Sequence, residues 1–373
     1  MKITVPTIDL GTSKIVTMVA QSNGERCDIV GSGAVPYSGY LQDGWNNPDE
    51  IRDVIRTAID QAQKTGNCRI HELNVGVPGM FTRVIVKEVH VSLTGPDPHV
   101  TAQDVRACFK LAEESGGDRI IHSAPAWFRV DDGKKTLSPV GIKGRELSAM
   151  IALVTADKYF IDDITYRLRD MDIEPREFYS TVAGEATYAL SQDERDKTAM
   201  LIDIGYLCTD VMVMEGDALI FHKCLDIGGG HISADIAEQL NIPFPFVEEK
   251  IKQTYSFNST NQDETYVIPA TEDEPARTVR RDEVTPIIEA KVEEIAEAIN
   301  KALEEGGVKL GKWSNVYLTG GGLILNKGGK DFLAGKLHRI IREAQRTNNK
   351  MTSHVFSSAV GLTILVVTTQ EEQ

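Results

Sequence analysis

Cysteine is scarce in this chain of 373 residues, and its spacing does not suggest a zinc site. No CxxC pair occurs, and no combination of cysteine and histidine has the spacing of zinc ligands. We therefore expect unpaired thiols, as in proteins of a reducing cytoplasm. The five scattered cysteines are Cys27, Cys68, Cys108, Cys208 and Cys224.

Long apolar runs are also missing. The N-terminus, "MKITVPTIDLG", reaches an acid before the apolar core of a signal peptide could form. Apolar stretches such as "LTILVV" at 362–367 are far too short to cross a bilayer. The sequence thus predicts a soluble, cytoplasmic protein.

Basic residues are outnumbered, 40 Lys and Arg against 55 Asp and Glu, which gives a formal charge of −15. Phosphate-rich surfaces would repel such a chain, so we expect it not to be a general binder of nucleic acid or anionic membranes. A nucleotide ligand is still allowed, because a metal ion and backbone N–H groups can offset charge locally. Neither GxxxxGK[ST] nor GxGxxG is present.

What the chain does contain is a repeated phrase. In "VPTIDLGTSKIV" (5–16) an apolar run leads to Asp9 and a small polar turn, and in "MLIDIGYLCTDVMV" (200–213) another leads to Asp203 and Gly205. Each phrase predicts a β-hairpin. A duplicated unit of this kind indicates two like domains facing each other across a cleft.

The elements around these phrases follow from local signals. Strands are expected within 3–35, then a helix at about 48–63, with Asn47 as its cap, Pro48 in its first turn and Glu50 as a capping-box acid. Residues 81–155 predict a separate α+β unit, with a helix over 101–115 between strands. Further helices are expected at 157–171 and 283–305. Residues 256–282 are expected to form loops and an edge strand.

A turn of Gly, Thr and Ser exposes backbone N–H groups that can wrap phosphate oxygens, and Lys14 adds a positive charge. An acid before the turn makes sense if a divalent cation lies between carboxylate and phosphate. For one copy alone an ordinary hairpin turn is the simpler interpretation. Two copies, with glycine triplets at 228–230 and 320–322 after expected strands, favour a nucleotide clamp.

"IDLGTSK", "LIDIGYLCTD" and "YLTGGG" resemble the two phosphate motifs and the adenosine motif of the actin-like ATPase superfamily. Within it, the chain resembles the bacterial cell-division FtsA family. The narrower match is carried by the first turn, by "IIHSAPAWFRVDDGKKTLSPVGIKGRELSAMIALVT", and by "CLDIGGGHISADIAEQL" with "VEEKIKQTY". The resemblance implies an α/β, actin-like fold: two duplicated RNase-H-like domains around a nucleotide cleft, with a small α+β insertion in the first.

The resemblance implies these domain bounds: 1–80 plus 156–195 for the first core domain, 81–155 for the insertion, 196–255 plus 313–373 for the second core domain, and 256–312 for its small subdomain. It also implies ATP and Mg²⁺ as ligands. Asp9 and Asp203 would position metal and water, with Mg²⁺ held through water. The residues expected on the nucleotide are Gly11, Thr12, Ser13, Lys14, Gly205, Thr209, Gly229, Gly230, Glu249, Lys252, Gly320, Gly321 and Gly322.

Glu249 and Lys252 are three residues apart, which would place both on one helix face toward ribose and base. The alternative for this pair is a solvated charged face. Tyr206, with Leu207 and Cys208, stands where the superfamily usually has small residues, which puts hydrolysis in doubt more than binding. Glu185 is the acid available to orient a water in its segment, although a helix-surface acid is the preferred interpretation there.

As an FtsA-like protein, the chain would polymerise and dock the C-terminal tail of the tubulin-like FtsZ. Arg281 and Lys291 are candidates for that acidic peptide, with solvated charges as the alternative for each. The family's amphipathic membrane helix has no match in "VTTQEEQ", so we expect membrane contact to be indirect or through a segment not present here. The resemblance also implies recruitment to the division site at the inner membrane face.

Two other functions stay open. The related pilus-assembly protein PilM shares the insertion and lacks the amphipathic tail, whereas the GTSK turn and the "PVGIKG" region favour FtsA. A metabolic kinase would need a catalytic acid, and no acid signature beyond Asp9 and Asp203 supports one. We expect at most slow ATP hydrolysis.

Overall fold

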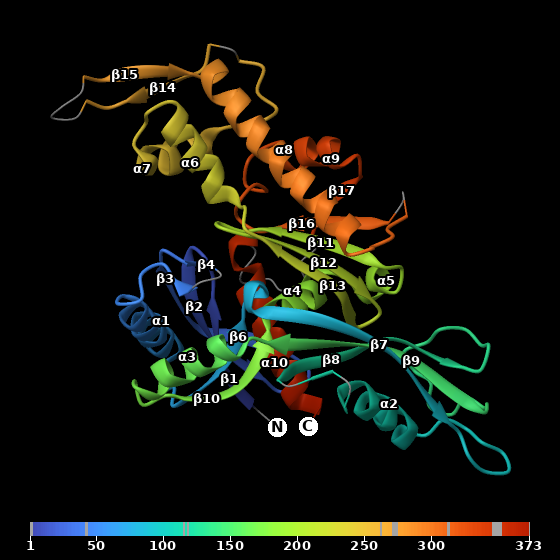
Figure 1. Ribbon diagram of the computed structural model, residues 1–373. Coiled ribbons are helices and arrows are strands. Elements are labelled where there is room, and N and C mark those ends of the chain that lie inside the picture. The colour runs from blue at the N-terminus through green and yellow to red at the C-terminus, as the bar shows by residue number, and fades with distance from the viewer. Residues whose placement is uncertain are drawn as a thin grey trace. The chain divides into compact units, whose positions relative to one another are not determined.

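Two compact units make up the chain in the computed structural model, which is drawn in Figure 1. The first comprises 1–201, 212–223 and 345–373, and the second comprises 202–211 and 224–344. The residues that the structure describes are 3–41, 44–114, 116–117, 119–261, 263–270, 275–311, 314–344 and 353–372.

A five-stranded sheet is the centre of the first unit, in the order β10-β6-β1-β2-β3. The first three strands in sequence form an antiparallel meander, and the other two run parallel to β1. Its strands are β1 (Ile3–Leu10), β2 (Lys14–Ser22), β3 (Cys27–Pro36), β6 (Glu72–Val77) and β10 (Glu174–Ser180).

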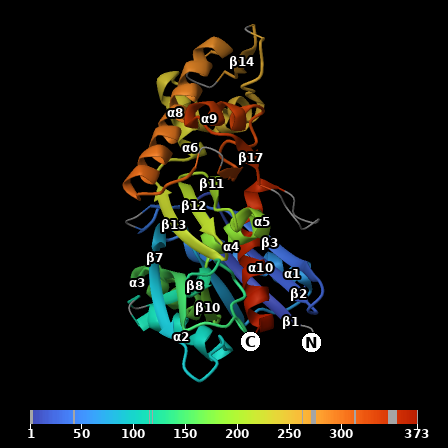
Figure 2. The ribbon, with the colours of Figure 1, turned by 90° about the vertical axis from the view of Figure 1, so that its right-hand side faces the viewer.

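Helices cover both faces of this sheet, because successive side chains of a strand point to opposite sides. Ile8 and Leu10 of β1 are buried in a core shared with α1 (Ile51–Gly66) and α3 (Lys158–Arg169). Val5 packs instead with α10 (Ser357–Glu372), which lies alongside β1 in Figures 1 and 2. α4 (Thr181–Ala189) packs beside α10.

Helix α1 begins later than its predicted start at 48. Residues 48–50 form a turn in which the amide of Glu50 donates to the carbonyl of Asn47, and the helix starts at Ile51. Asn47 and Pro48 therefore direct the preceding turn, and Glu50 takes the N-cap position without a side-chain capping bond. The expected apolar face is confirmed, since Ile51, Ile55 and three further residues of α1 are buried.

The C-terminal helix belongs to the first unit, whereas 313–373 was expected in the second domain. Thr363 of α10 shares a 2.7 Å hydrogen bond with Thr7 of β1 in the buried interior. A Cβ on Gly361 would lie 2.5 Å from the Cα of Glu185, so the backbones of α10 and α4 are in direct contact. Glycine at this crossing allows the close packing. The predicted boundary between 312 and 313 lies outside the described residues.

The predicted insertion is a sheet of order β7-β9-β8 with α2 (Ala102–Glu114) on one face. Its strands are β7 (Thr82–Ser92), β8 (Ile120–Val130) and β9 (Glu146–Ala156). Cys108 and Ala112 of α2 are buried against the sheet. The opposite face packs through Ala124 and Ala126 on Ala218 of β13 (Ala218–Leu225). The predicted last residue of this helix, 115, lies outside the described residues.

A second five-stranded sheet has the order β13-β12-β11-β16-β17. Its other strands are β11 (Ala199–Ile204), β12 (Thr209–Glu215), β16 (Asn315–Thr319) and β17 (Ile341–Glu343). The smaller elements of the chain are β4 (Tyr40–Leu41), β5 (Gly44–Trp45), the 3-10 turns Gly79–Phe81 and His354–Phe356, and α5 (Gln192–Arg195).

The helices described in the second unit follow β13 in the sequence. They are α6 (Gly229–Gln239), α7 (Phe244–Phe246), a π-helix over Val247–Lys252, α8 (Arg281–Glu305) and α9 (Gly329–Leu337). α8 contacts α6 and α9, and confirms the helix predicted at 283–305 with a start two residues earlier. A hairpin of β14 (Thr265–Ile268) and β15 (Arg277–Arg280) lies within the stretch expected as loop and edge. In the part of the chain that the structure describes, no helix combines the length and apolar character needed to cross a membrane.

Candidate functional site

The first repeated phrase forms the hairpin that its sequence predicts. β1 and β2 pair as far as Leu10 and Ile15, and the amide of Gly11 donates a 3.0 Å hydrogen bond to the carbonyl of Lys14. A Cβ on Gly11 would lie 2.9 Å from that carbonyl oxygen, so glycine permits the tight turn. The loop is tied to its surroundings by the hydroxyl of Tyr40, which donates to the Leu10 carbonyl at 2.8 Å.

Asp9, at the end of β1, is a buried acid. Only 8% of its surface is exposed, and its Oδ2 accepts a 2.9 Å hydrogen bond from the hydroxyl of Ser358 on α10. Burial raises the pKa of this carboxyl, and the Ser358 hydrogen bond and the charge of Lys14 offset only part of that effect. A carboxylate held in such a place is stabilised by any cation that reaches it.

Lys14 ends the first loop and begins β2. Its ammonium lies 5.2 Å from the ring centroid of Phe356, close enough for a cation–π contact. Phe356 precedes α10, so the same C-terminal segment supports both Lys14 and, through Ser358, Asp9.

The second phrase repeats the same backbone closure. The amide of Gly205 donates to the carbonyl of Cys208 at 2.9 Å, three residues on, as Gly11 does to Lys14. A Cβ on Gly205 would lie 3.0 Å from that carbonyl. The predicted repeat is therefore present in hydrogen bonding as well as in sequence, and it places Cys208 where the first loop has Lys14.

Backbone amides of three glycines in the second unit donate hydrogen bonds to carbonyls in and next to the second loop. The amides of Gly229 and Gly230, in the first turn of α6, donate to the carbonyls of Gly205 at 2.8 Å and Tyr206 at 2.7 Å. The amide of Gly322 donates to the carbonyl of Ile204 at 2.7 Å. These three N–H groups fix the shape of the loop. The expected proximity of the three glycines to a nucleotide stays a prediction.

Steric limits explain why these positions are glycine. A Cβ on Gly229 would lie 2.4 Å from the Cα of Gly322. Gly320 has a φ of +87°, and a Cβ there would lie 2.0 Å from Oδ1 of Asp203. Gly321 lies in the bend between Gly320 and Gly322. The three glycines after β16 thus allow the backbone to approach the carboxylate of Asp203 closely.

Thr209 lies at the end of the second loop, where its hydroxyl has a structural role. It is fully buried, and its hydroxyl donates a 2.7 Å hydrogen bond to the carbonyl of Ile227. That bond joins the start of β12 to the segment before α6. The hydroxyl therefore anchors the second loop and is not positioned as a surface donor for a phosphate.

Lys252 and Glu249 do not share a face. They lie in the π-helix, whose winding is wider than that of an α-helix, and Lys252 is buried whereas Glu249 is exposed. The ammonium of Lys252 donates to the carbonyl of Gly229 at 2.7 Å and pairs with Glu248 at 3.2 Å. Burial lowers the pKa of Lys252, against the opposing effect of Glu248. Glu248 is a member of this cluster that sequence reasoning missed.

Tyr206 packs over the start of α6. A Cβ on Gly230 would lie 3.0 Å from ring atoms of Tyr206, and the ammonium of Lys252 lies 5.8 Å from the ring centroid. Burial, followed by the charge of Glu248, raises the pKa of the phenol. The bulky departure from the superfamily pattern is thus accommodated by a glycine and a lysine of the same unit.

Glu185 is not the helix-surface acid that the sequence favoured. It lies in α4 with 2% of its surface exposed, beneath the crossing with α10. The other interpretation, that Glu185 orients a water, stays a prediction.

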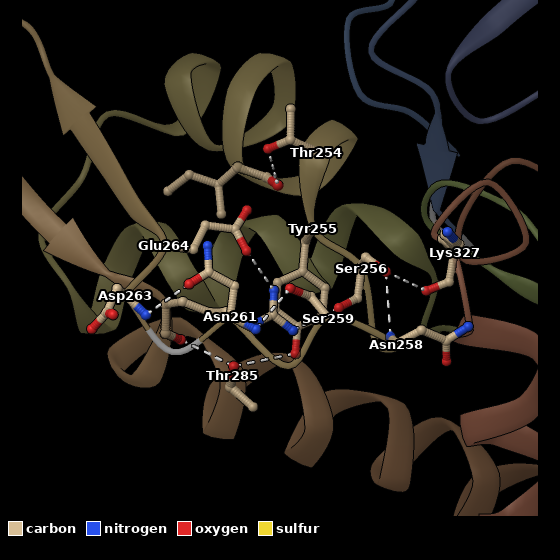
Figure 3. A network of polar contacts seen from close by, with 12 residues as sticks. Thr254, Tyr255, Ser256, Asn258, Ser259, Asn261, Asp263, Glu264, Thr285 and Lys327 are labelled. Atoms are coloured by element: carbon tan, nitrogen blue, oxygen red, sulfur yellow. Dashed lines mark hydrogen bonds and ion pairs between the residues drawn. The ribbon is translucent and has the colours of Figure 1, made fainter.

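Arg281 and Lys291, the candidates for an acidic peptide, are engaged inside the second unit. The side chain of Arg281 is 7% exposed, donates to the carbonyl of Ser256 at 2.6 Å and pairs with Glu264 at 3.3 Å. Figure 3 shows Ser256 and Glu264 in this network. Lys291 is 13% exposed and pairs with Asp235 and Glu294. Neither is the solvated surface charge that was the alternative, and a peptide would have to break these pairs to reach them.

Comparison with known families decides between the two leading interpretations. A family model described as cell division protein FtsA matches residues 200–361, and one described as the SHS2 domain inserted in FtsA matches residues 79–155. Together they cover more than half of the chain. The chain belongs to the FtsA family. The second match supports the predicted insertion at 81–155.

Whole-chain relatives agree with this assignment. Cell division protein FtsA of Pseudomonas aeruginosa is 26% identical over 320 residues, covering 84% of this chain and 76% of the relative. FtsA of Bacillus subtilis is 26% identical over 306 residues, covering 81% of this chain and 70% of the relative.

Solved structures show the actin-like fold. A PilM–PilN type IV pilus biogenesis complex contains a chain that matches with a TM-score of 0.64 and 17% identity, covering 98% of this FtsA-family chain and 99% of its own. MreB5 of Spiroplasma citri bound to AMPPNP matches with a TM-score of 0.59 and 11% identity, covering 99% of this chain and 97% of the MreB5 chain. At these identities the likeness concerns the fold, which confirms the predicted fold class.

Proposed function

We propose that this FtsA-family protein binds Mg·ATP and acts in bacterial cell division as an actin-like assembly protein. The observation that carries the proposal is the pair of acid-led hairpins with the same Gly-amide closure, at Asp9–Lys14 and Asp203–Cys208, in a chain of this family. The AMPPNP-bound MreB5 structure supports a nucleotide ligand for the fold.

The residues of each loop fit the ligand. A buried carboxylate such as Asp9 is stabilised by a nearby cation, directly or through its water shell. Magnesium usually keeps several waters and binds through one or two carboxylates plus phosphates, which matches a single acid in each loop. The Mg²⁺ ion that accompanies bound ATP would supply the positive charge that neutralises these acids.

The chain's own groups would then divide the work. Asp9 and Asp203 would orient the hydrated metal. Gly11 and Gly205 would shape the two loops, and Lys14 would add charge for a phosphate. Lys252, anchored on the Gly229 carbonyl, would hold the segment over which the nucleoside lies. Glu185 would be the acid that orients a water, and Tyr206 would limit hydrolysis to a slow rate.

The decisive experiment is titration of the purified protein with a fluorescent ATP analogue and Mg²⁺. Asp203→Ala should weaken binding by at least tenfold, because the acid of the second loop is lost. Asp263→Ala removes an exposed acid of the same unit and should leave the affinity unchanged. Unchanged affinity in Asp203→Ala would refute the placement of the metal.

Division partners form the second part of the proposal. We infer that the protein docks the C-terminal peptide of FtsZ and polymerises through actin-like contacts at the inner face of the membrane. Family membership and the actin-like fold support this. Fluorescence anisotropy with the peptide should show micromolar binding, and electron microscopy with ATP and Mg²⁺ should show filaments. No peptide binding at high micromolar concentration would count against the division role.

A further inference from the structure

Two of the scattered cysteines meet in the folded chain. The Sγ atoms of Cys208 and Cys224 and a carboxylate oxygen of Asp210 all lie within 4.8 Å of one another. Cys208 closes the second loop, Asp210 stands two residues later in β12, and Cys224 comes from the neighbouring strand β13. The 16-residue separation of the cysteines hid this group from any search for motifs.

We propose that Cys208, Asp210 and Cys224 form a binding site for a thiophilic divalent cation, with zinc as its natural occupant. Two thiolates and a carboxylate are ligands that zinc accepts, and three protein ligands with water in the fourth position are a known zinc arrangement. Magnesium and calcium prefer oxygen ligands, so the two sulfurs select against them.

The distances suit such an ion. A point equidistant from three atoms that are 4.8 Å apart lies about 2.8 Å from each, whereas zinc bonds measure about 2.3 Å to sulfur and 2.0–2.2 Å to oxygen. The ligand atoms therefore need to move inward by less than about 1 Å, which side-chain rotation provides. Cys208 is buried and the other two side chains are partly buried, so the backbone that carries them is held in place and a water can still reach the ion.

The electrostatics of the group favour a cation. A hydrogen bond with Cys208, burial and the charge of Asp210 together hold the pKa of the Cys224 thiol well above its usual range. A divalent ion reverses these effects, because it binds the deprotonated sulfurs and neutralises the carboxylate. Binding thus releases thiol protons to the solvent, and affinity should rise with pH.

The experiment uses Co²⁺ as a spectroscopic probe and Zn²⁺ as its competitor on the full-length, pre-reduced protein. One Co²⁺ per chain should bind with a sulfur-to-cobalt charge-transfer band in the near ultraviolet, and one equivalent of Zn²⁺ should abolish it. Cys224→Ser should remove the band, and Asp210→Asn should weaken Co²⁺ binding at least tenfold. Cys68→Ser, which removes a partly buried thiol of the first unit, should change neither.

Circular dichroism spectra and melting temperatures of the variants separate loss of the site from loss of the fold. A folded wild-type protein without a charge-transfer band would overturn the proposal. So would a band that survives in a folded Cys224→Ser variant. Because the readout uses no nucleotide, its outcome is independent of whether the protein binds Mg·ATP.

Discussion

The ammonium of Lys252 donates a 2.7 Å hydrogen bond to the carbonyl of Gly229. This bond joins the π-helix to the first turn of α6, whose amides in turn hold the second loop. A charged side chain in a buried place is costly unless it is paired, and here the carbonyl and Glu248 supply the pairing. The cluster therefore links the position of the loop to a lysine more than forty residues away.

Lys252→Met should destabilise the protein by about 1–3 kcal/mol, since a buried carbonyl loses its donor and Glu248 loses its cation. Urea unfolding measures the change. Lys250→Met removes an exposed lysine of the same π-helix and should cost about 0.5 kcal/mol or less. Equal stability of the two variants would show that the Gly229 hydrogen bond contributes nothing.

Gly320→Ala tests the close approach of the glycine triplet to Asp203. The left-handed conformation alone costs an alanine about 1–2 kcal/mol, and the Cβ would also collide with Oδ1 of Asp203. We expect a loss of stability about 1–3 kcal/mol beyond that conformational cost, together with weaker Mg·ATP binding. Stability follows from urea unfolding and affinity from titration with a fluorescent nucleotide.

Gly141→Ala is the matched control for this variant. Gly141 has nearly the same φ, +88°, and nothing within 4 Å of its added Cβ. It therefore reports the conformational cost alone, and nucleotide affinity should stay at the wild-type level. If both variants lost the same stability and kept the same affinity, contact between the Gly320 position and Asp203 would be irrelevant.

The sequence was informative where chemistry is local. Asp9 and Asp203 each stand near the end of a strand, two residues before a glycine, and this pattern predicted both hairpins. Their shared Gly-amide closure became visible only in the structure. The insertion was also predicted, because residues 81–155 have the strand and helix order of a separate α+β unit and resemble the inserted subdomain of the FtsA family. FtsA-family membership followed from the same segments.

Other features depended on contacts that no local pattern encodes. The sequence predicted that Gly229 and Gly230 lie near a nucleotide, but it did not show that their amides hold the second loop. A π-helix differs from an α-helix by one residue per turn, so i, i+3 reasoning misplaced Glu249 relative to Lys252. The burial of Thr209 and Arg281 could not be predicted, because burial depends on distant segments. Cys208 and Cys224 meet only through strand pairing.

Asp9 provides a test with a defined pH dependence. Burial raises its pKa in the native state above the unfolded value of 3.8, so between these two values the native state binds more protons than the unfolded state. Stability therefore falls as pH rises across that window, and the cost is fully present above it. Asp9→Asn should be more stable than wild type at neutral pH by on the order of 1 kcal/mol.

This advantage should fade as pH falls below 3.8, and it should come with weaker Mg·ATP binding at neutral pH. Chemical denaturation at a series of pH values measures the difference. Asp49→Asn, at an exposed position of the same unit, should match wild type throughout. A stability difference for Asp9→Asn that does not change with pH would contradict the assigned cause.

Adjacent arginines at the start of α8 allow the peptide-binding expectation to be tested. Arg281 is 7% exposed and lies 4.2 Å from the ring centroid of Tyr255, whereas Arg280 is 63% exposed and pairs with Asp282 at the surface. Arg281→Met should cost about 2–3 kcal/mol of stability, because Glu264 and the Ser256 carbonyl lose their donor. Arg280→Met should cost about 0–1 kcal/mol.

The affinity for the FtsZ peptide should change in the opposite order, with a larger loss for Arg280→Met than for Arg281→Met. If an acidic peptide docks on the hairpin of β14 and β15, it would contact the exposed Arg280 at the end of β15. Arg280→Met should therefore weaken peptide binding while the fold is unchanged. Peptide anisotropy at a temperature where both variants are folded gives the comparison. Weaker binding in folded Arg281→Met with wild-type binding in Arg280→Met would restore Arg281 as the contact residue, and would require the ion pair with Glu264 to open when the peptide binds.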